Sequence, residues 1–347
     1  MSFPIINCDF RIPKIKKVET TDTSTAASTG ASTTASTGAS TTASTGASTT
    51  ASTGASTTAS TGASTTASTG ASTTAKRNTT KPNHPKITIS QLDMFRLCAS
   101  LTILFIGDNS IRTLYRDFVQ ILSDGKLLIK NEATKQHGNY KEVEGEVRLQ
   151  EGGTLGALDY KDVHHYFCET SSTQLIYIYI PTVFGDIAKT NINFLKTITS
   201  CRSIHVLIFS LYHGDLNFRK LREIKKKNFK PHLEQYDENL NKICQYLTNI
   251  CNNKICGPQQ KIWMSPYPPN FKLTKTQKEQ FKEIIFHTDT IAEINDFKPF
   301  KRNFIWKKTH KELIGKNKHH FSPKGIRLMT QFLAKIIGRK RKRTIIK

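Results

Sequence analysis

The sequence contains no long hydrophobic run. No stretch reaches the roughly 18 consecutive apolar residues that a membrane-spanning helix requires. The first 17 residues, MSFPIINCDFRIPKIKK, also lack the continuous apolar core of a secretory signal peptide. The sequence therefore predicts a protein without a transmembrane segment, and we expect it in the cytoplasm or the nucleus.

Cysteine is scarce and follows no metal-ligand or disulfide spacing. The chain has seven cysteines in 347 residues, and in the cytoplasm they stay reduced. The closest group, Cys244, Cys251 and Cys256, is too irregular for a zinc site. The histidines at 164–165 and at 213 have no neighbours at metal-ligand spacing either. We therefore expect no metal and no other cofactor.

Large apolar side chains are missing from much of the first quarter of the chain. From residue 27 to residue 74 the octapeptide Ala-Ser-Thr-Gly-Ala-Ser-Thr-Thr repeats six times. Such a segment cannot bury enough apolar surface to offset the entropy lost on ordering. We predict that residues 1–85 are disordered. The Ser/Thr-rich repeats are either modification sites or a repeat without a function of its own.

Acidic residues are few relative to basic ones. The formal net charge is +24, with basic runs at 219–227, 301–318 and 339–343. This excess favours weak, non-specific association with nucleic acid or acidic surfaces, although no base-reading motif accompanies it. We treat residues 339–347 as a basic C-terminal tail, whose run RKRKR is either a nuclear import signal or the solvated end of a helix.

The stretch LTILFIGDNSIRTLYRDF, residues 101–118, predicts a β-strand, a tight turn and a helix. Its first six residues are apolar or Thr without alternation, as in a strand buried on both faces of a parallel sheet. Gly107 permits a sharp reversal, and Asn109 is the expected N-cap of a helix over 110–123. Backbone N–H groups at such a helix start converge on an anion or on the negative charge of a transition state. An ordinary βα junction gives the same pattern.

Further predicted strands are separated by helical stretches. A helix over 89–100, capped by Ser90, precedes the first strand, another is predicted over 236–251, and a final one follows Phe321. This alternation predicts a three-layer α/β/α domain over 86–338, with a doubly wound, mostly parallel sheet and ligands at the carboxyl ends of its strands. The other expected strands are 126–130, 146–156, 160–168, 174–184, 204–211, 261–265 and 283–287.

Short motifs along this domain resemble the PC-esterase domain proteins, a branch of the GDSL/SGNH hydrolases. Gly107-Asp108, Arg112 and Tyr115-Arg116-Asp117 are similar to the opening of that family. The later matches keep the family's order over about residues 88–337: Gly152-Gly153-x-Leu155-Gly156, Tyr160-Lys161-Asp162-Val163, the strand 204–210 with Asp215-Leu216, Tyr236-x-Glu238-Asn239-Leu240, Trp263 with Pro268, and His320-Phe321. The resemblance implies an SGNH-type fold and an acyl-transfer site.

In that family a Gly-Asp-Ser motif supplies a serine nucleophile, a glycine N–H and an Asn side chain form the oxyanion hole, and an Asp-x-x-His supplies the acid and the base. These groups must converge, because the base takes the proton of the nucleophile while the donors face the developing oxyanion. Carried over to this chain, the resemblance assigns Asn109 to the nucleophile position with Ser110 beside it, Gly152 or Gly153 and Ser210 to the oxyanion hole, Asn317 and His320 to the acid and base, and Asp108 and Arg112 to supporting positions.

The chain departs from the family at three of these positions. The amide of Asn109 cannot act as an acyl-accepting nucleophile, and Ser110 points about 100° away from it on an ideal helix. Ser210 replaces the oxyanion-hole amide but can still donate one hydrogen bond. Asn317 can hold an imidazole but cannot stabilise imidazolium by charge, a change that costs roughly 10⁴ in rate in a serine protease.

The leading hypothesis is therefore a catalytically degraded or very weak hydrolase-fold protein. It would keep a pocket at the strand ends for a small ester or an anionic ligand. An active serine ester hydrolase that uses Ser110 and His320 is the first alternative, and a basic module that binds nucleic acid or acidic partners is the second. We expect a monomer.

Overall fold

The computed structural model describes residues 86–134, 143–154, 159–184, 191–196, 203–212, 214–216, 229–251, 260–267, 272–302, 311–315 and 320–345. For residues 134, 311 and 340–345 it describes the backbone alone. The predicted disorder of 1–85, the basic run 219–227 and Asn317 lie outside these residues. Within the described ranges, no helix is long and apolar enough to cross a membrane.

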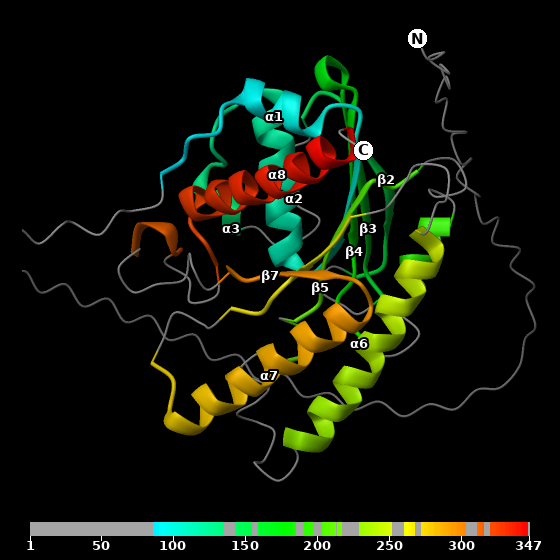
Figure 1. Cartoon of the computed structure of the whole chain (residues 1–347), viewed down its shortest axis with the longest axis vertical. Coiled ribbons are helices and arrows are strands. Elements are labelled where there is room, and N and C mark those ends of the chain that lie inside the picture. The colour runs from blue at the N-terminus through cyan, green and yellow to red at the C-terminus, as the bar shows by residue number, and fades with distance from the viewer. Residues whose placement is uncertain are drawn as a thin grey trace, which may run out of the picture. The chain divides into compact units, whose positions relative to one another are not determined.

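A seven-stranded sheet forms the centre of the described domain (Figure 1), in the order β2-β3-β4-β1-β5-β6-β7. β4, β1, β5, β6 and β7 run parallel, whereas β3 is antiparallel to both β4 and β2. The predicted α/β class with a mostly parallel sheet is therefore confirmed. The strands are β1 (Thr102–Gly107), β2 (Glu146–Gly152), β3 (Lys161–Cys168), β4 (Thr173–Tyr179), β5 (Val206–Ser210), β6 (Gln260–Met264) and β7 (Lys298–Phe300).

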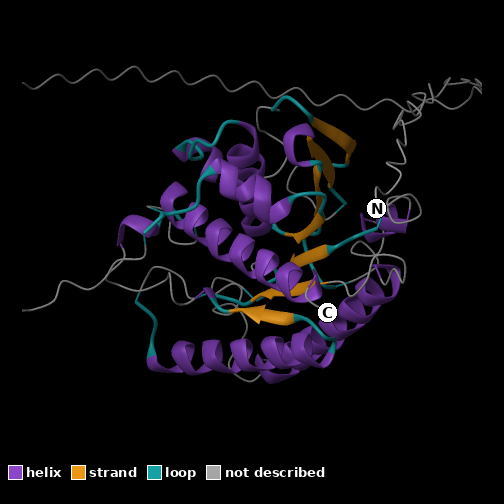
Figure 2. Ribbon diagram, turned by 45° about the horizontal axis from the view of Figure 1, so that its top comes forward, coloured by secondary structure: helices purple, strands orange, loops and turns teal. Residues whose placement is uncertain are grey.

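Helices lie on both sides of the strands, as Figure 2 shows. Each face has its own cluster of buried hydrophobic side chains, which contains residues of the helices that cover it. One face is covered by α1 (Gln91–Cys98), α2 (Asn109–Ser123), α3 (Lys130–Thr134) and α8 (Pro323–Ile345), and the other by α6 (Phe229–Cys251) and α7 (Lys275–Ile294).

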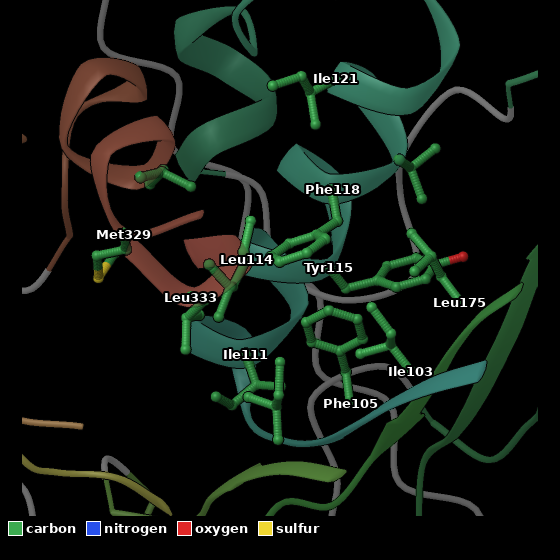
Figure 3. Close-up of a cluster of buried hydrophobic side chains, with 14 of the residues drawn as sticks. Ile103, Phe105, Ile111, Leu114, Tyr115, Phe118, Ile121, Leu175, Met329 and Leu333 are labelled. Carbon is green, nitrogen blue, oxygen red and sulfur yellow. The ribbon is translucent and has the colours of Figure 1, made fainter. Parts of the chain in front are cut away.

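The core between β1 and α2 supports the candidate site (Figure 3). Phe105 of β1 makes edge-on ring contacts with Tyr115 and Phe118 of α2, at centroid distances of 5.8 and 5.2 Å. All three side chains are fully buried. Because aromatic pairs in this geometry add stability beyond their buried area, they fix α2 against the strand that leads into it.

Buried polar contacts attach α8 to the same helix. Nε of Arg327 in α8 donates to both carboxylate oxygens of Asp117 in α2, at 3.2 and 3.0 Å. Gly338 of α8 lies so close to Leu97 of α1 that a Cβ atom would be 2.3 Å from a Leu97 methyl carbon. The backbone of α8 continues beyond this contact as a helix through the basic run 339–343.

Two of the predicted strands are wrong. Residues 283–287 lie inside α7, where Ile284 and Thr288 are buried while Phe286 is 69% exposed. The run EIIFH is part of an amphipathic helix, and a short apolar run cannot be assigned to strand or helix by its pattern alone. Residues 126–130 form a loop that ends at the first residue of α3.

The remaining predicted elements are confirmed with shifted ends. The helix predicted over 89–100 is α1, and Ser90 caps it in a reciprocal capping box with Asp93. α6 begins at Phe229, earlier than predicted, and the strand predicted over 174–184 ends at Tyr179. The short edge strand β7 was not predicted, because three residues that include a proline carry no strand pattern.

Candidate functional site

The candidate site lies where β1, β5 and β6 end at one edge of the sheet. Gly107, the last residue of β1, pairs with Ser210 at the end of β5. A Cβ atom on Gly107 would lie 2.1 Å from the carbonyl oxygen of Ser210 and 2.7 Å from Cγ1 of Ile111, and its φ is 152°. Only glycine permits this close approach, so Gly107 fixes the turn from β1 into α2.

Asp108 is the N-cap of α2. Its Oδ1 accepts hydrogen bonds from the backbone N–H of Ser110 at 2.8 Å and from Ser110 Oγ at 2.7 Å. A carboxylate at this position also interacts favourably with the helix dipole. The prediction that Asn109 caps the helix is wrong, since Asn109 is the first residue of α2. Asp and Asn are equally good caps, so the sequence could not tell which of the two neighbours does so.

The hydroxyl of Ser110 is part of this cap. A serine nucleophile must pass its proton to a base as it attacks. In the structure the acceptor of that proton is the carboxylate of Asp108, which also accepts the Ser110 N–H. Ser110 and Asn109 are both half-buried at the start of α2. The expected nucleophile position is therefore occupied by the amide of Asn109, and the neighbouring Ser110 hydroxyl is hydrogen-bonded to the capping carboxylate.

Ser210 is fully buried at the end of β5. Its Oγ donates to the main-chain carbonyl of Met264 in the neighbouring strand β6, at 3.0 Å. A serine hydroxyl has a single proton to donate. The resemblance assigns this proton to an oxyanion hole, but in the structure it forms the hydrogen bond from β5 to β6. The hydroxyl would have to rotate and break that bond to reach a ligand.

The structure does not bring Gly152 beside the start of α2. Gly152 ends β2, and the sheet order places β3 and β4 between β2 and β1. Three inter-strand spacings separate the two strands by about 14 Å. Gly153 has a φ of 74° and turns away from β2, with a Cβ position 2.7 Å from the carbonyl oxygen of Asp159. These glycines shape the turn after β2.

Arg112 belongs to a buried group of charges that joins α2 to α3 and β2. Its Nη2 is 3.9 Å from Glu132 of α3, and its side chain is fully buried. One turn further along α2, Arg116 forms an ion pair with Glu146 of β2, which also accepts a hydrogen bond from Tyr115 at 3.0 Å. Arg112 thus supports the side of the domain that carries α3 and β2.

Arg302 is a site residue that the sequence reasoning missed. It follows β7 and is 1% exposed. Its Nε donates to the carbonyl of Ser265 at 2.7 Å, and its Nη2 donates to the carbonyl of Met264 at 3.1 Å. The Met264 oxygen also accepts the hydrogen bond from Ser210, so Arg302 is joined to the strand that pairs with Gly107. In the sequence it stands in a basic run that is typical of a solvated surface, so nothing indicated its burial.

Tyr267 links this arginine to Asp108. The Arg302 guanidinium lies over the Tyr267 ring, 4.5 Å from its centroid. Burial raises the pKa of Tyr267 well above its ordinary value; the Arg302 charge opposes this and the Asp108 carboxylate adds to it. Burial lowers the pKa of Arg302, and its interactions with Tyr267 and with the Asp108 carboxylate partly offset that effect. Arg302 and Tyr267 are therefore in contact at this edge, and the Asp108 carboxylate acts on both electrostatically.

The segment that contains His320 reaches the same edge. Phe321 contacts the Tyr267 ring at a centroid distance of 4.7 Å. The segment is held by a β-bridge between Ile314 and Phe321 and by a hydrogen bond from Gly315 N to the His320 carbonyl at 2.7 Å. His320 itself is half-buried.

The donor chemistry of the site is that of hydrogen bonds and charge. In the described part of the chain, no group of three or more His, Cys, Asp and Glu side chains is arranged to hold a metal ion. The groups that converge are one carboxylate, one guanidinium, a phenol, the start of α2 and the segment with His320. Such a set can bind and orient a polar ligand.

No protein-family model matches this chain, and no curated protein matches it. Among solved structures it is similar to a GDSL-like lipase from Parabacteroides merdae, with 12% identity and a TM-score of 0.42 over 73% of this chain and 99% of the lipase. It is also similar to an acetylxylan esterase from Geobacillus stearothermophilus, with 12% identity and a TM-score of 0.39 over 70% of this chain and 96% of the esterase. The function proposed for this chain therefore rests on its own residues.

Proposed function

We propose that this protein is a non-hydrolytic or very weakly hydrolytic member of the SGNH-type hydrolase fold. Its site at the carboxyl ends of β1, β5 and β6 binds a small ester or anionic ligand. The observation that carries the proposal is the start of α2, where Asn109 occupies the first helical position and the Ser110 hydroxyl donates to the capping carboxylate of Asp108.

The arrangement of the neighbouring groups supports weak chemistry at best. The Ser110 hydroxyl is bound to a carboxylate that already accepts a backbone N–H, so rotating it toward another base would break one bond of the cap. The Ser210 hydroxyl donates to a main-chain carbonyl. Acyl transfer requires a free nucleophile and preorganised oxyanion donors at the same time.

Ester turnover tests this proposal. The full chain should hydrolyse 4-nitrophenyl acetate no faster than its Ser110→Ala variant, once the rate without protein is subtracted. Ser110 is the only hydroxyl in the start of α2 at residues 108–112, so its removal should eliminate any serine chemistry there. A turnover that depends on both Ser110 and His320 would contradict the proposal.

One observation keeps an active serine hydrolase as the alternative. Phe321, next to His320, contacts the Tyr267 ring. That ring also contacts Arg302 and is influenced by the charge of Asp108, the cap of the helix that carries Ser110. This supports a position of His320 near Ser110. In this alternative His320 is the general base and the Ser110 hydroxyl leaves its capping bond when substrate binds. The loss of turnover in both Ser110→Ala and His320→Ala would support it.

A second candidate function is association with nucleic acid or acidic surfaces. The basic run 339–343 lies at the end of α8, beyond the contact between Gly338 and Leu97. Cations near a helix C-terminus also stabilise the helix through its dipole, which is a purely structural reason for the same residues. The two roles can be told apart by experiment. If the run binds polyanions, the affinity for RNA depends on residues 339–343 and falls with added salt, whereas a purely structural role predicts neither effect.

A further inference from the structure

We propose that Arg302 anchors the ligand of this site and that the ligand carries a carboxylate group. This inference rests on the proposed ligand site at the strand ends and names the chemistry that the site recognises. Its basis is a buried guanidinium with unused hydrogen-bond donors beside the start of α2.

Only some of the N–H donors of Arg302 form hydrogen bonds. A guanidinium has five N–H donors. Two of them bind the carbonyls of Ser265 and Met264. The other three have no hydrogen-bond partner among the described residues. Since Arg302 is 1% exposed, water outside the domain cannot satisfy them freely.

Unused donors on a buried cation are costly. Nearly all buried polar groups in folded proteins have a partner, and charged groups lose the most when they have none. The centroid of the Tyr267 ring lies 4.5 Å from Cζ of Arg302, and a ring contact of this kind uses none of the guanidinium's hydrogen-bond donors. Asp108 acts on Arg302 through space, without a hydrogen bond between them, while its Oδ1 accepts the two bonds from Ser110. A hydrogen-bond acceptor on a bound ligand would satisfy the remaining N–H donors of Arg302.

The local charges favour a monoanion. The planar edge of a guanidinium matches the two oxygens of a carboxylate, and such bonds are about twice as strong as bonds between neutral groups. The start of α2 at the same edge adds a partial positive charge. The carboxylates of Asp108 and Asp289, which both act on Arg302, oppose every further negative charge. A carboxylate should therefore bind better than inorganic phosphate, and a neutral amide of the same shape should bind least.

The side-chain Nε–H signal of Arg302 provides a direct test in the full chain. The signal is assigned in ¹⁵N-resolved NMR spectra by its absence from the Arg302→Lys variant. At constant ionic strength, acetate should shift it with a saturable curve, inorganic phosphate should do so more weakly, and acetamide should leave it unchanged. Arg302→Lys should bind acetate at least about tenfold more weakly, because it keeps the charge and loses the planar edge.

Arg327→Lys is the matched control. Arg327 is also a buried arginine, 3% exposed, but it binds Asp117 between α8 and α2. This variant should bind acetate as the unmodified chain does. Equal shifts with acetate and acetamide, or unchanged acetate binding in Arg302→Lys, would overturn the inference. If Arg302→Lys does not fold, the signal is assigned by side-chain triple-resonance experiments on the unmodified chain, and the presence or absence of a saturable acetate shift there decides the question.

The failure of this inference can be told apart from a failure of the proposed function. Ester turnover through Ser110 together with a saturable acetate shift would refute the non-hydrolytic function and leave the anchor in place. An absence of both turnover and acetate shift would refute the anchor and leave the non-hydrolytic function in place.

Discussion

At the scale of single residues, the site is organised by Asp108. Its carboxylate caps α2 through Ser110, and its charge acts on Tyr267 and on Arg302. One side chain thus contributes both to the stability of a helix and to the electrostatics of the candidate site. Substitutions can separate these two contributions, because a cap requires an acceptor oxygen while the electrostatic effect requires a charge.

We predict that Asp108→Ala lowers the free energy of unfolding by about 1 kcal/mol, as the loss of a good N-cap does. Asp108→Asn should change it much less, because an amide oxygen still accepts the bond from the Ser110 N–H. Urea denaturation of the two variants measures the difference. If both variants lose the same stability, the charge of Asp108 contributes more to the fold than its capping bond does.

The residue scale is also where sequence reasoning reached its limit. The motif around Gly107 predicted the turn, because a glycine between a buried strand and a helix is typical of a sharp reversal. The choice between Asp108 and Asn109 as the cap could not be made, since both residue types cap equally well. Arg302 stands among cations at 301–318, and burial of one member of a charge run leaves no trace in the sequence.

At the scale of elements, the turn from β1 into α2 determines where the site lies. At Gly107, the last residue of β1, the backbone lies directly against the Ser210 carbonyl of β5 and the Ile111 side chain in the first turn of α2. The same sheet order keeps Gly152 three strands away, although the two glycines carry similar motif signals in the sequence. The order of the motifs along the chain therefore predicted which helices and strands form, but it did not predict which of them lie next to one another at the site.

Gly107→Ala should be strongly destabilising, by more than about 2 kcal/mol, because its Cβ would overlap the Ser210 carbonyl and its φ is positive. Gly125→Ala is the matched control. Gly125 also has a positive φ, of 75°, but a Cβ there would be 3.5 Å from its nearest neighbour, Gln91. Gly125→Ala should cost only the backbone strain of a left-handed conformation, about 1–2 kcal/mol. Equal losses in urea denaturation would show that close packing at Gly107 is unimportant.

At the scale of the whole molecule, charge is the dominant feature. The net charge of +24 is far from zero, and such a chain attracts polyanions whether or not it has a specific site. Any binding experiment therefore has to separate general attraction from recognition. Salt dependence does so, since it reports how many phosphate groups a complex neutralises.

We predict that the affinity of the full chain for a generic single-stranded RNA falls steeply between low and high salt. Replacing the five basic residues of 339–343 by Gln should reduce the slope of log K against log salt by several units, at about 0.7 for each phosphate that is no longer neutralised. Replacing Lys275, Lys278 and Lys282 by Gln is the control, because these lysines lie on another helix, α7. An unchanged slope in the first variant would exclude the end of α8 as the binding surface.

The proposed function depends above all on the start of α2 presenting no reactive hydroxyl, and covalent labelling measures this property. The full chain is incubated with a serine-reactive fluorophosphonate, and its intact mass and modified peptides are measured beside those of Ser110→Ala. We expect that neither protein gains the mass of the probe. Stoichiometric labelling of Ser110 that disappears in Ser110→Ala would refute the proposed function.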